Sequence, residues 1–348
     1  MSEHRALTIG GIEIAAGTRQ TINLPVADLY IGTPVHLPVI VHRGTRPGPV
    51  MFLSAAMHGD EINSVEIVRR VLKLPALQEL AGTLLAVPVV NVLAFLHQSR
   101  YLPDRRDLNR SFPGSDSGSL AARLANLFLK EVVGKADFGI DLHTGAIHRP
   151  NLPQIRADLS NADNKRLAKA FGAPLFLDSK PAEGTLRAYT TAHNIPAILY
   201  EACEALRFDE TAIRIGVQGV ANVMMELEML PKSGDAPVST VTPIYAKSEG
   251  WARAPVSGIL RAQAALGDAV KKGEVLGVIG DPFDEREVPV IAPFGGIIIG
   301  RVMLPLVYEG EAAFHIARVE TPNEAEKNVD QIEAESAEWG GHAEPRIV

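Results

Sequence analysis

The sequence predicts an α/β fold, and the alternation of two kinds of pattern leads to that prediction. Near-continuous apolar runs, typical of strands buried on both faces, lie at 50–56, 82–90, 138–142 and 195–200. Stretches with apolar residues at helical spacing lie between or after them, at 62–71, 117–134 and 216–230. Strands that alternate with helices favour a mixed, mostly parallel sheet flanked by helices.

The texture of the sequence divides the chain into four segments. Residues 1–45 form an N-terminal β segment, in which short β-type runs are separated by Pro and Gly, and residues 46–235 form the α/β domain. Residues 245–318 are rich in Gly and short β runs, and we expect them to form a smaller, separate all-β domain. Residues 319–348 form an acidic tail, either a surface helix or a partly disordered segment.

Composition limits the classes of partner and the compartment. No apolar run approaches the roughly 20 residues of a membrane span, and the N-terminus has no apolar signal core. The single cysteine, Cys203, excludes an internal disulfide, so we expect a cytoplasmic protein with no membrane partner. The net charge of −7 gives no support to nucleic-acid binding. The oligomeric state stays open, a homo-oligomer included.

Two histidines and a glutamate follow buried strands at one predicted edge of the sheet. His58 and Glu61 lie three residues apart where the first apolar run meets a helix, and His143 directly follows the run at 138–142. The His-x-x-Glu spacing alone is weak evidence for a metal site, because a His at the end of a strand and a Glu at the start of a helix often occur together by chance. Ligands bind at the carboxyl ends of strands in open α/β sheets, and two His with one Glu is a known catalytic zinc set. We therefore expect one Zn²⁺ at these residues, with Asp141 as a hydrogen-bond partner of an imidazole.

A further glutamate at the same edge is a candidate catalytic base. Metal-assisted amide hydrolysis needs a group that takes a proton from water and passes it to the leaving amine. Glu201, which ends the apolar run at 195–200, is our candidate. Glu204 is the alternative, and strand alternation places it on the opposite face.

The segment 99–114 combines several arginines with Asn109 and a Phe-Pro-Gly turn. A guanidinium can bind a carboxylate through two parallel hydrogen bonds, so an arginine of this segment could bind a substrate carboxylate. A second guanidinium could stabilise the oxyanion formed when water adds to an amide carbonyl. An ordinary solvated loop is the alternative interpretation of the segment.

Taken together, these motifs resemble those of the succinylglutamate desuccinylase/aspartoacylase family, which has a zinc carboxypeptidase-like fold. The matching motifs are His58-Gly-Asp-Glu61, Arg106-Asp-Leu-Asn-Arg110-Ser-Phe-Pro-Gly114, Asp141-Leu-His143-Thr and Glu201. The resemblance covers roughly residues 46–230, and the β segment to about residue 318 is consistent with it. It departs in one place, because Ala202 and Cys203 follow Glu201 where other members have a glycine.

The resemblance implies a catalytic role for each motif residue. Zinc would be held by His58, Glu61 and His143, and Glu201 would be the general base and acid. Asn109 and Arg110 would bind a substrate carboxylate, and an upstream arginine would polarise the carbonyl. Arg100 stands before Tyr101 like the arginine of the family's Arg-Tyr pair, whereas Arg106 lies closer to the Asp-Leu-Asn-Arg core.

The implied function is that of a zinc-dependent amidohydrolase. It would cleave the amide bond of a small N-acyl amino acid, or a related carboxylate-bearing molecule, by means of metal-activated water. A non-catalytic binding protein on the same fold and a metallocarboxypeptidase acting on peptides are the alternatives.

The segment 245–318 resembles a biotinyl or lipoyl carrier domain. The similarity lies in Ala254-Pro-Val-Ser-Gly258 and in 267–276. The interval 274–291, where a carrier would place its modified lysine, contains no Lys. We therefore expect a carrier-like fold without a carrier function, which covers or shapes the active site or contacts another subunit.

Four other histidines lie near motifs or strands, and we expect a structural or surface role for each of them. They are His97, His148, His193 and His315. His148 is the one of most interest, because it follows His143 by five residues in a loop near the proposed metal.

Overall fold

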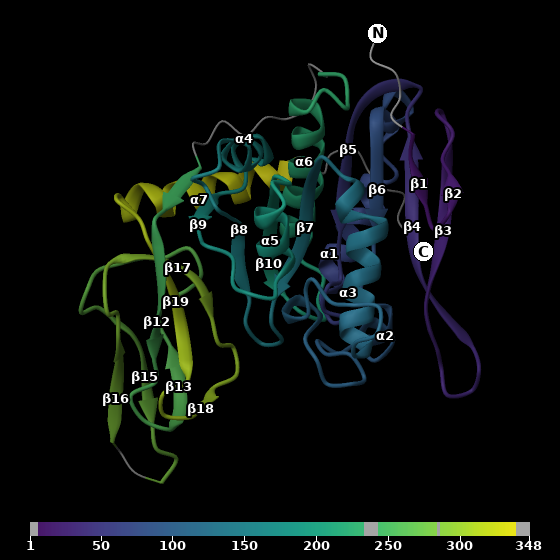
Figure 1. Cartoon of the computed structure of the whole chain (residues 1–348). Coiled ribbons are helices and arrows are strands. Elements are labelled where there is room, and N and C mark those ends of the chain that lie inside the picture. The colour runs from purple at the N-terminus through teal and green to yellow at the C-terminus, as the bar shows by residue number, and fades with distance from the viewer. Residues whose placement is uncertain (1–5, 233–242, 284–285, 339–348) are drawn as a thin grey trace, which may run out of the picture.

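The computed structural model describes residues 6–232, 243–283 and 286–338, and one large mixed sheet runs through it (Figure 1). The main path of this 13-stranded sheet is β12-β19-β17-β8-β10-β7-β5-β6-β4-β3, with β9, β11 and β14 paired beside it. The strands are β3 (Arg19–Asp28), β4 (Pro34–Arg43), β5 (Arg46–Ser54), β6 (Ala81–Val87), β7 (Phe138–Gly145), β8 (Asn151–Ala157), β9 (Leu175–Asp178), β10 (Ala197–Glu204), β11 (Ile244–Ala246), β12 (Ser248–Arg253), β14 (Ala269–Val270), β17 (Gly296–Arg301) and β19 (Ala312–Arg318). The α/β class predicted from the alternating patterns is thereby confirmed.

Helices lie on both faces of this sheet, and two small sheets complete the fold. The helices are α1 (Ile62–Val71), α2 (Val92–Leu96), α3 (Leu120–Glu131), α4 (Ala162–Phe171), α5 (Leu186–Ala192), α6 (Glu210–Glu226) and α7 (Pro322–Glu338), with the 3₁₀ turns η1 (Pro75–Glu79), η2 (Leu108–Arg110) and η3 (Val133–Lys135). The smaller sheets are formed by β1 (Thr8–Ile9) with β2 (Ile12–Glu13), and by β13 (Gly258–Ala262), β15 (Val275–Gly280), β16 (Glu287–Ile291) and β18 (Leu306–Val307).

The centre of the large sheet is parallel, and this arrangement positions the candidate site. β6, β5, β7 and β10 are neighbours and run in the same direction. Ser54 of β5 pairs with Asp141 of β7, and Glu201 of β10 pairs with His143 of β7. The carboxyl ends of these strands therefore meet at one edge, where ligands bind in open α/β sheets.

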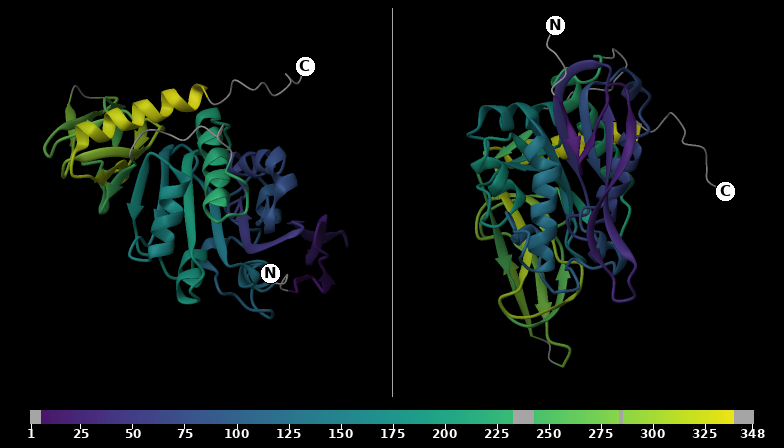
Figure 2. Two further views of the ribbon diagram at one scale, coloured as in Figure 1. Left: turned by 90° about the horizontal axis from the view of Figure 1, so that it is seen from above. Right: turned by 45° about the vertical axis from the view of Figure 1, so that its right-hand side comes forward.

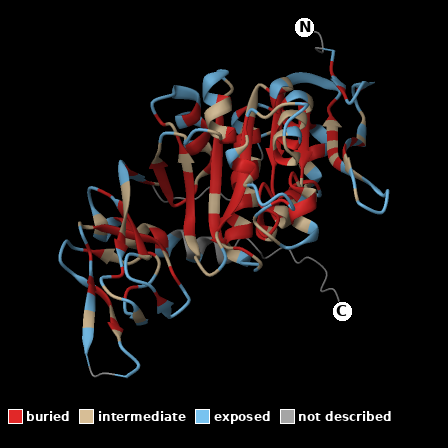
Figure 3. Ribbon diagram, turned by 60° about the horizontal axis from the view of Figure 1, so that its bottom comes forward, coloured by how far each residue is buried: buried red, intermediate tan, exposed pale blue. Residues whose placement is uncertain are grey.

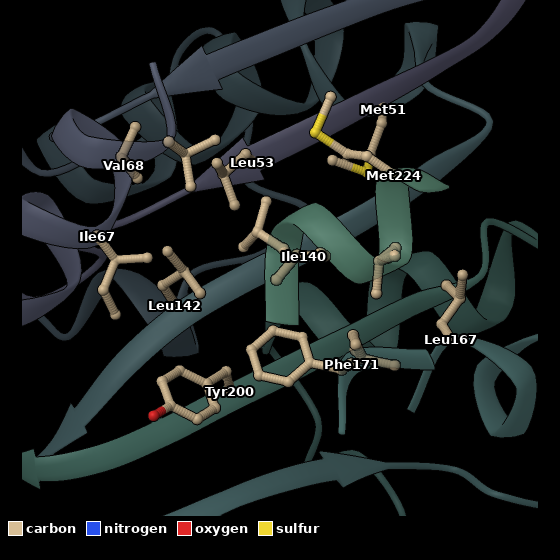
Figure 4. Close-up of a cluster of buried hydrophobic side chains, with 14 of the residues drawn as sticks. Met51, Leu53, Ile67, Val68, Ile140, Leu142, Leu167, Phe171, Tyr200 and Met224 are labelled. Atoms are coloured by element: carbon tan, nitrogen blue, oxygen red, sulfur yellow. The ribbon is translucent and has the colours of Figure 1, made fainter. Parts of the chain in front are cut away.

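Alternation along the buried strands supplies two separate hydrophobic cores. Met51 and Leu53 of β5 point into a core covered by α1, α4 and α6, part of which Figure 4 shows. Val50 and Phe52 point into the opposite core, which α3 covers through residues such as Phe128. The central strands are accordingly buried over most of their length (Figure 3). This double burial explains why their sequences are continuous apolar runs.

The C-terminal β region continues the large sheet. β17 pairs with β8 at Gly300 and Asn151, and β12 and β19 extend the sheet beyond β17. The four-stranded sheet lies at the end of the molecule away from the β3–β4 hairpin (Figures 1 and 2). Strands of the all-β segment expected from the sequence thus belong to the same sheet as those of the α/β part. The boundaries of the segment stay a prediction.

The structure describes the segment before β11 and the end of the chain only in part. The described portion of the acidic tail forms α7, whose buried Ala325 and Val329 belong to a small core with β17 and β19. Residues 233–242, which precede β11, and residues 339–348 lie outside the described residues. In the part of the chain that the structure covers, none of the helices has the length and apolar character needed to cross a membrane.

Candidate active site

The loop after β5 brings His58 and Glu61 to the edge of the sheet. Glu61 stands at the N-cap position of α1, directly after the Met57-His58-Gly59-Asp60 turn. A Cβ atom at Gly59 would lie 2.0 Å from the carbonyl carbon of Ala94, so only glycine lets this turn pack against the end of α2. The geometry of this turn therefore fixes the positions of the His58 imidazole and the Glu61 carboxylate relative to each other.

His58, Glu61 and His143 form a buried cluster whose ligand atoms lie within 4.8 Å of one another. The Nδ1 atom of His58 is 2.6 Å from Oε1 of Glu61, and the Nδ1 atom of His143 is 2.8 Å from Oε2. The other ring nitrogens face carboxylates: His143 Nε2 lies 2.8 Å from Asp141 Oδ2, and His58 Nε2 lies 3.1 Å from Asp107 Oδ1. Metal-binding histidines usually have such a partner on the second nitrogen.

This cluster fits a metal ion. Oε2 of Glu61 is fully buried and close to His143, yet no hydrogen bond of acceptable geometry reaches it. Burying a carboxylate oxygen without a donor is costly, and a cation would remove that cost. Two imidazole nitrogens and a carboxylate are donors that suit Zn²⁺ and related divalent metals. The structure thus brings the three predicted residues together as a group that could hold a metal ion.

The electrostatics of the triad follow from its burial and its opposite charges. Burial alone raises the pKa of Glu61, but His58 and His143 outweigh it and hold the pKa well below the usual range. Burial lowers the pKa of both imidazoles, whereas the adjacent carboxylates raise it above the ordinary value. The negative charge of Glu61 is therefore kept at neutral pH, as a metal ligand requires.

Asp107 connects the triad to Arg100. Its Oδ1 accepts a hydrogen bond from the backbone N–H of Asn109 at 2.8 Å, and its Oδ2 accepts one from Arg100 at 3.0 Å. The guanidinium of Arg100 lies 3.7 Å from Oε1 of Glu61. Arg106, in contrast, has a side chain that is 63% exposed and a single ion-pair partner in the described chain, Asp104 at 3.9 Å. The structure brings Arg100 to the site and leaves Arg106 on the surface.

Asn109 and Arg110 lie beside the triad on η2. Oδ1 of Asn109 accepts a hydrogen bond from the backbone N–H of Leu186 at 3.0 Å, which ties η2 to the start of α5. Arg110 donates to the backbone carbonyl of Asn109 at 2.6 Å. No carboxylate of the described residues forms an ion pair with Arg110, so its guanidinium is available for a ligand.

Glu201 faces the same cavity from β10, and Asn151 holds it. The side-chain amide of Asn151 donates a hydrogen bond to Oε1 of Glu201. A β-bulge separates Glu201 from Glu204, and Cys203 within it has a φ of 54°. Bulges redirect side chains next to active sites. Glu204 is paired with Arg207, and the hollow that it lines with Cys203 is separate from the triad.

One cavity of about 690 Å³ contains these groups, which is a volume typical of small-molecule sites. We call His58, Glu61, His143 and Glu201 its floor. A second group of lining residues, which we call the wall, consists of Glu249, Trp251 and His315 from β12 and β19 of the C-terminal region. The sequence-predicted residues Arg100, Asn109 and Arg110 also line the cavity, whereas Arg106 does not.

The wall is held by stacking and ion pairs. The rings of Trp251 and His315 are parallel within 6°, with centroids 4.2 Å apart. Glu249 lies 3.1 Å from Nε2 of His315 and 2.5 Å from the guanidinium of Arg156. Burial raises the pKa of Glu249, but His315 and Arg156 outweigh it and lower the pKa to about 2. The wall is therefore fixed in place before any ligand binds.

Arg187 supplies a second guanidinium without a counterion. It lines the cavity and donates to the backbone carbonyl of Ser179 at 3.1 Å, but it has no ion pair with any described carboxylate. Burial, together with the nearby charge of Arg156, lowers the pKa of Arg187 to about 10. A half-buried guanidinium that forms no ion pair is a typical binding group for an anionic ligand.

Sequence reasoning missed several residues of this cavity. Five lining residues belong to no motif that we identified in the sequence: Asn151, Arg156, Arg187, Glu249 and Trp251. His315 was expected to have a structural or surface role but lines the cavity. His148, which the sequence places in a loop near the proposed metal, is absent from the lining, and its backbone carbonyl accepts a hydrogen bond from the N–H of Met303.

The remaining histidines lie outside the site. His97 and His193 are exposed residues at the C-terminal ends of α2 and α5.

Comparisons with known proteins agree with this geometry. Residues 47–227, just over half of the chain, match the model of the succinylglutamate desuccinylase/aspartoacylase catalytic domain. The chain is 27% identical over 316 residues to the N-alpha-acetyl-L-2,4-diaminobutyric acid deacetylase of Halomonas elongata, which covers 86% of this chain and 90% of that protein. The match thus extends well beyond the catalytic domain.

Solved structures show the same fold. A succinylglutamate desuccinylase/aspartoacylase from Rhodobacter sphaeroides has a TM-score of 0.78 at 22% identity, over 87% of this chain and 95% of that one. The product-bound ectoine utilization protein EutE (DoeB) from Ruegeria pomeroyi has a TM-score of 0.77 at 22% identity, over 86% and 94%. Together with the family match and the buried triad, these findings show that the chain belongs to the succinylglutamate desuccinylase/aspartoacylase family.

Proposed function

We propose that this protein is a zinc-dependent amidohydrolase that removes the acyl group from a small N-acyl amino acid. One observation carries the proposal: the triad of His58, Glu61 and His143 shares a single cavity with the carboxylate of Glu201 and the guanidinium of Arg110. A metal site, a base and a carboxylate-binding group are the parts that such a reaction needs.

The triad would hold Zn²⁺ through the Nδ1 atoms of both histidines and the carboxylate of Glu61. When bound there, the ion supplies Lewis acidity, which favours deprotonation of water and polarises a carbonyl group. Asp141 and Asp107 keep the two imidazoles oriented from behind.

The other groups of the cavity have distinct tasks. Glu201 takes the proton from the attacking water and delivers it to the leaving amine. Arg100, held by Asp107, presents its guanidinium to the carbonyl oxygen as negative charge develops on it. Asn109 and Arg110 hold the substrate carboxylate, which places the amide bond over the floor.

The charges of the cavity favour an anionic substrate. Its cationic lining groups are Arg100, Arg110, Arg149, Arg156, Lys180 and Arg187, and its acidic ones are Glu61, Glu201 and Glu249. Arg110 and Arg187 both lack an ion-pair partner among the described residues, so each can bind a carboxylate of the substrate. The wall restricts the cavity to small molecules, which argues against peptides as substrates. All required groups are present, which argues against a purely binding role.

A metal assay combined with a substrate screen tests this function. The wild type should contain about one zinc per chain, and His143→Ala should lose it because a ligand is removed. His97→Ala, which changes an exposed histidine outside the cavity, is the control and should keep its zinc. The wild type should then hydrolyse at least one member of a panel of N-acetyl and N-succinyl amino acids, N-acetyl-diaminobutyrate included. A wild type that cannot be loaded with zinc, or that is loaded and inactive on the whole panel, contradicts the proposal.

A further inference from the structure

We propose that Asn151 is the positioning residue of Glu201, and that the C-terminal β region sets its position through Gly300. This inference rests on the proposed function, because it assigns the orientation of the group that moves the proton. None of the sequence motifs contains Asn151, and its importance follows from its contacts alone.

The first step is the direct contact between the two side chains. The amide nitrogen of Asn151 donates to Oε1 of Glu201, and both residues line the cavity of the metal triad. An amide donor holds a carboxylate without adding a charge that would compete with the metal. With Oε1 held in this way, Oε2 is the oxygen that exchanges the proton with water and with the leaving amine.

The second step is the backbone that holds Asn151. It is the first residue of β8, and it pairs with Cys203 of β10 on one side and with Gly300 of β17 on the other. Cys203 belongs to the bulge that follows Glu201. The residue therefore lies between β10, the strand of the base, and β17, the strand of the C-terminal region that pairs with β8.

The third step is the packing of the amide group itself. A Cβ atom built at Gly300 would lie 2.6 Å from Oδ1 of Asn151, and one at Gly145 would lie 3.2 Å from its Cγ. The amide thus fills the space left by two glycines. Gly145 lies on β7, two residues after His143, and Gly300 lies on β17. Because close-packed interiors transmit such shifts, a methyl group at Gly300 should displace Asn151 and, through it, Glu201.

A double-mutant cycle with the metal-loaded full-length protein tests the kinetic part. Asn151→Ala should lower kcat about 10- to 100-fold with little change in KM or zinc content, because small displacements of a catalytic group are costly. In a Glu201→Gln background the same substitution should change kcat less than about two-fold, because the group that it positions is gone. Additive losses in the double variant overturn the proposal, as does an unchanged kcat in Asn151→Ala.

Asn164→Ala is the matched control for structural damage. Asn164 is a buried asparagine, and its Oδ1 accepts a hydrogen bond from the backbone N–H of Ala197 at 2.9 Å, at the start of the strand that carries Glu201. Its substitution should lower the melting temperature, and any loss of kcat should be additive with Glu201→Gln. If Asn151→Ala fails to fold, Gly300→Ala replaces it in the cycle with the same expectation.

A crystal structure of Asn151→Ala separates this inference from the proposed function. The Glu201 carboxylate should move by about 1 Å or more, or lose its single conformation, whether or not a substrate has been found. A carboxylate that keeps its place overturns the positioning role even in an active enzyme. A wild type that is zinc-loaded but inactive on every substrate, with Glu201 displaced in the variant, overturns the proposed function and leaves the positional claim standing.

Discussion

The floor and the wall of the cavity differ in how their residues are brought together. The floor takes its groups from the ends of adjacent parallel strands and the turn after β5, where Glu201 pairs directly with His143. The wall takes Glu249 and Trp251 from β12 and His315 from β19, more than 100 residues after His143 in the chain. The floor is built on the most buried part of the sheet, and the wall on its distal extension.

This difference indicates separate tasks for the two surfaces. The floor holds groups that can bind a metal and move a proton, so its chemistry needs fixed distances of a few ångströms. The wall holds a stacked ring pair and an ion pair, which set shape and charge rather than reactivity. Substitutions in and around the floor should therefore reduce kcat, and those in the wall should change KM or stability.

The largest expected effect is a loss of kcat, and it distinguishes Arg100 from Arg106, the two arginines that were candidates for the same role. Arg100→Ala should lower kcat about 100- to 1000-fold, because it removes a donor aimed at developing negative charge. Arg106→Ala should stay within about two-fold of wild type, since that side chain is exposed and outside the cavity. Steady-state kinetics on the best substrate of the panel measure both, with zinc content as a check on the metal site. A loss of kcat in Arg106→Ala that matches Arg100→Ala would reverse the assignment.

The floor could be predicted from the sequence because each of its residues follows a recognisable strand. Continuous apolar runs locate the buried parallel strands, and the polar residues just after them must meet at one edge. His58, Glu61, His143 and Glu201 were found in this way, and the structure places all of them in one cavity. The sequence could not separate Arg100 from Arg106, because both lie in one irregular loop, where side-chain direction depends on packing.

The wall could not be predicted for a physical reason. Which residues of β12 and β19 face the cavity depends on the pairing of β17 with β8, a contact between residues 149 positions apart. Strand alternation gives two faces but does not say which of them meets another part of the molecule. The same limit explains why the C-terminal β segment was expected to be separate, although its strands extend the large sheet.

A smaller effect concerns the ion pair that anchors the wall. Glu249→Gln should lower the free energy of unfolding by about 2 kcal/mol at pH 7, because the carboxylate is stabilised by Arg156 and His315 and its side chain is only 25% exposed. Since its pKa in the folded protein is depressed to about 2, this contribution exists above pH 4.5 and is lost as the pH falls towards 2. The stability difference between wild type and variant should therefore shrink below pH 4.5.

Urea unfolding of both proteins at pH 7, 4 and 3 measures this difference. Glu320→Gln, which changes an exposed partner of Lys247, should leave the pH profile of stability close to that of the wild type. A gap between wild type and Glu249→Gln that stays constant down to pH 3 would show that the ion pair does not stabilise the wall.

The smallest effect distinguishes His315 and His148, two histidines for which we expected a structural or surface role from the sequence. His315→Ala should raise KM about two- to ten-fold with little change in kcat, because losing the stack on Trp251 costs about 1 kcal/mol and loosens the wall. His148→Asn should leave both constants unchanged. The contact of His148 with Met303, shortly after β17, is made by its backbone carbonyl, and Asn tolerates the positive φ of 59° at this position. A fall in kcat for His315→Ala without a change in KM would mean that the wall takes part in the chemistry, and the division of tasks between floor and wall would then fail.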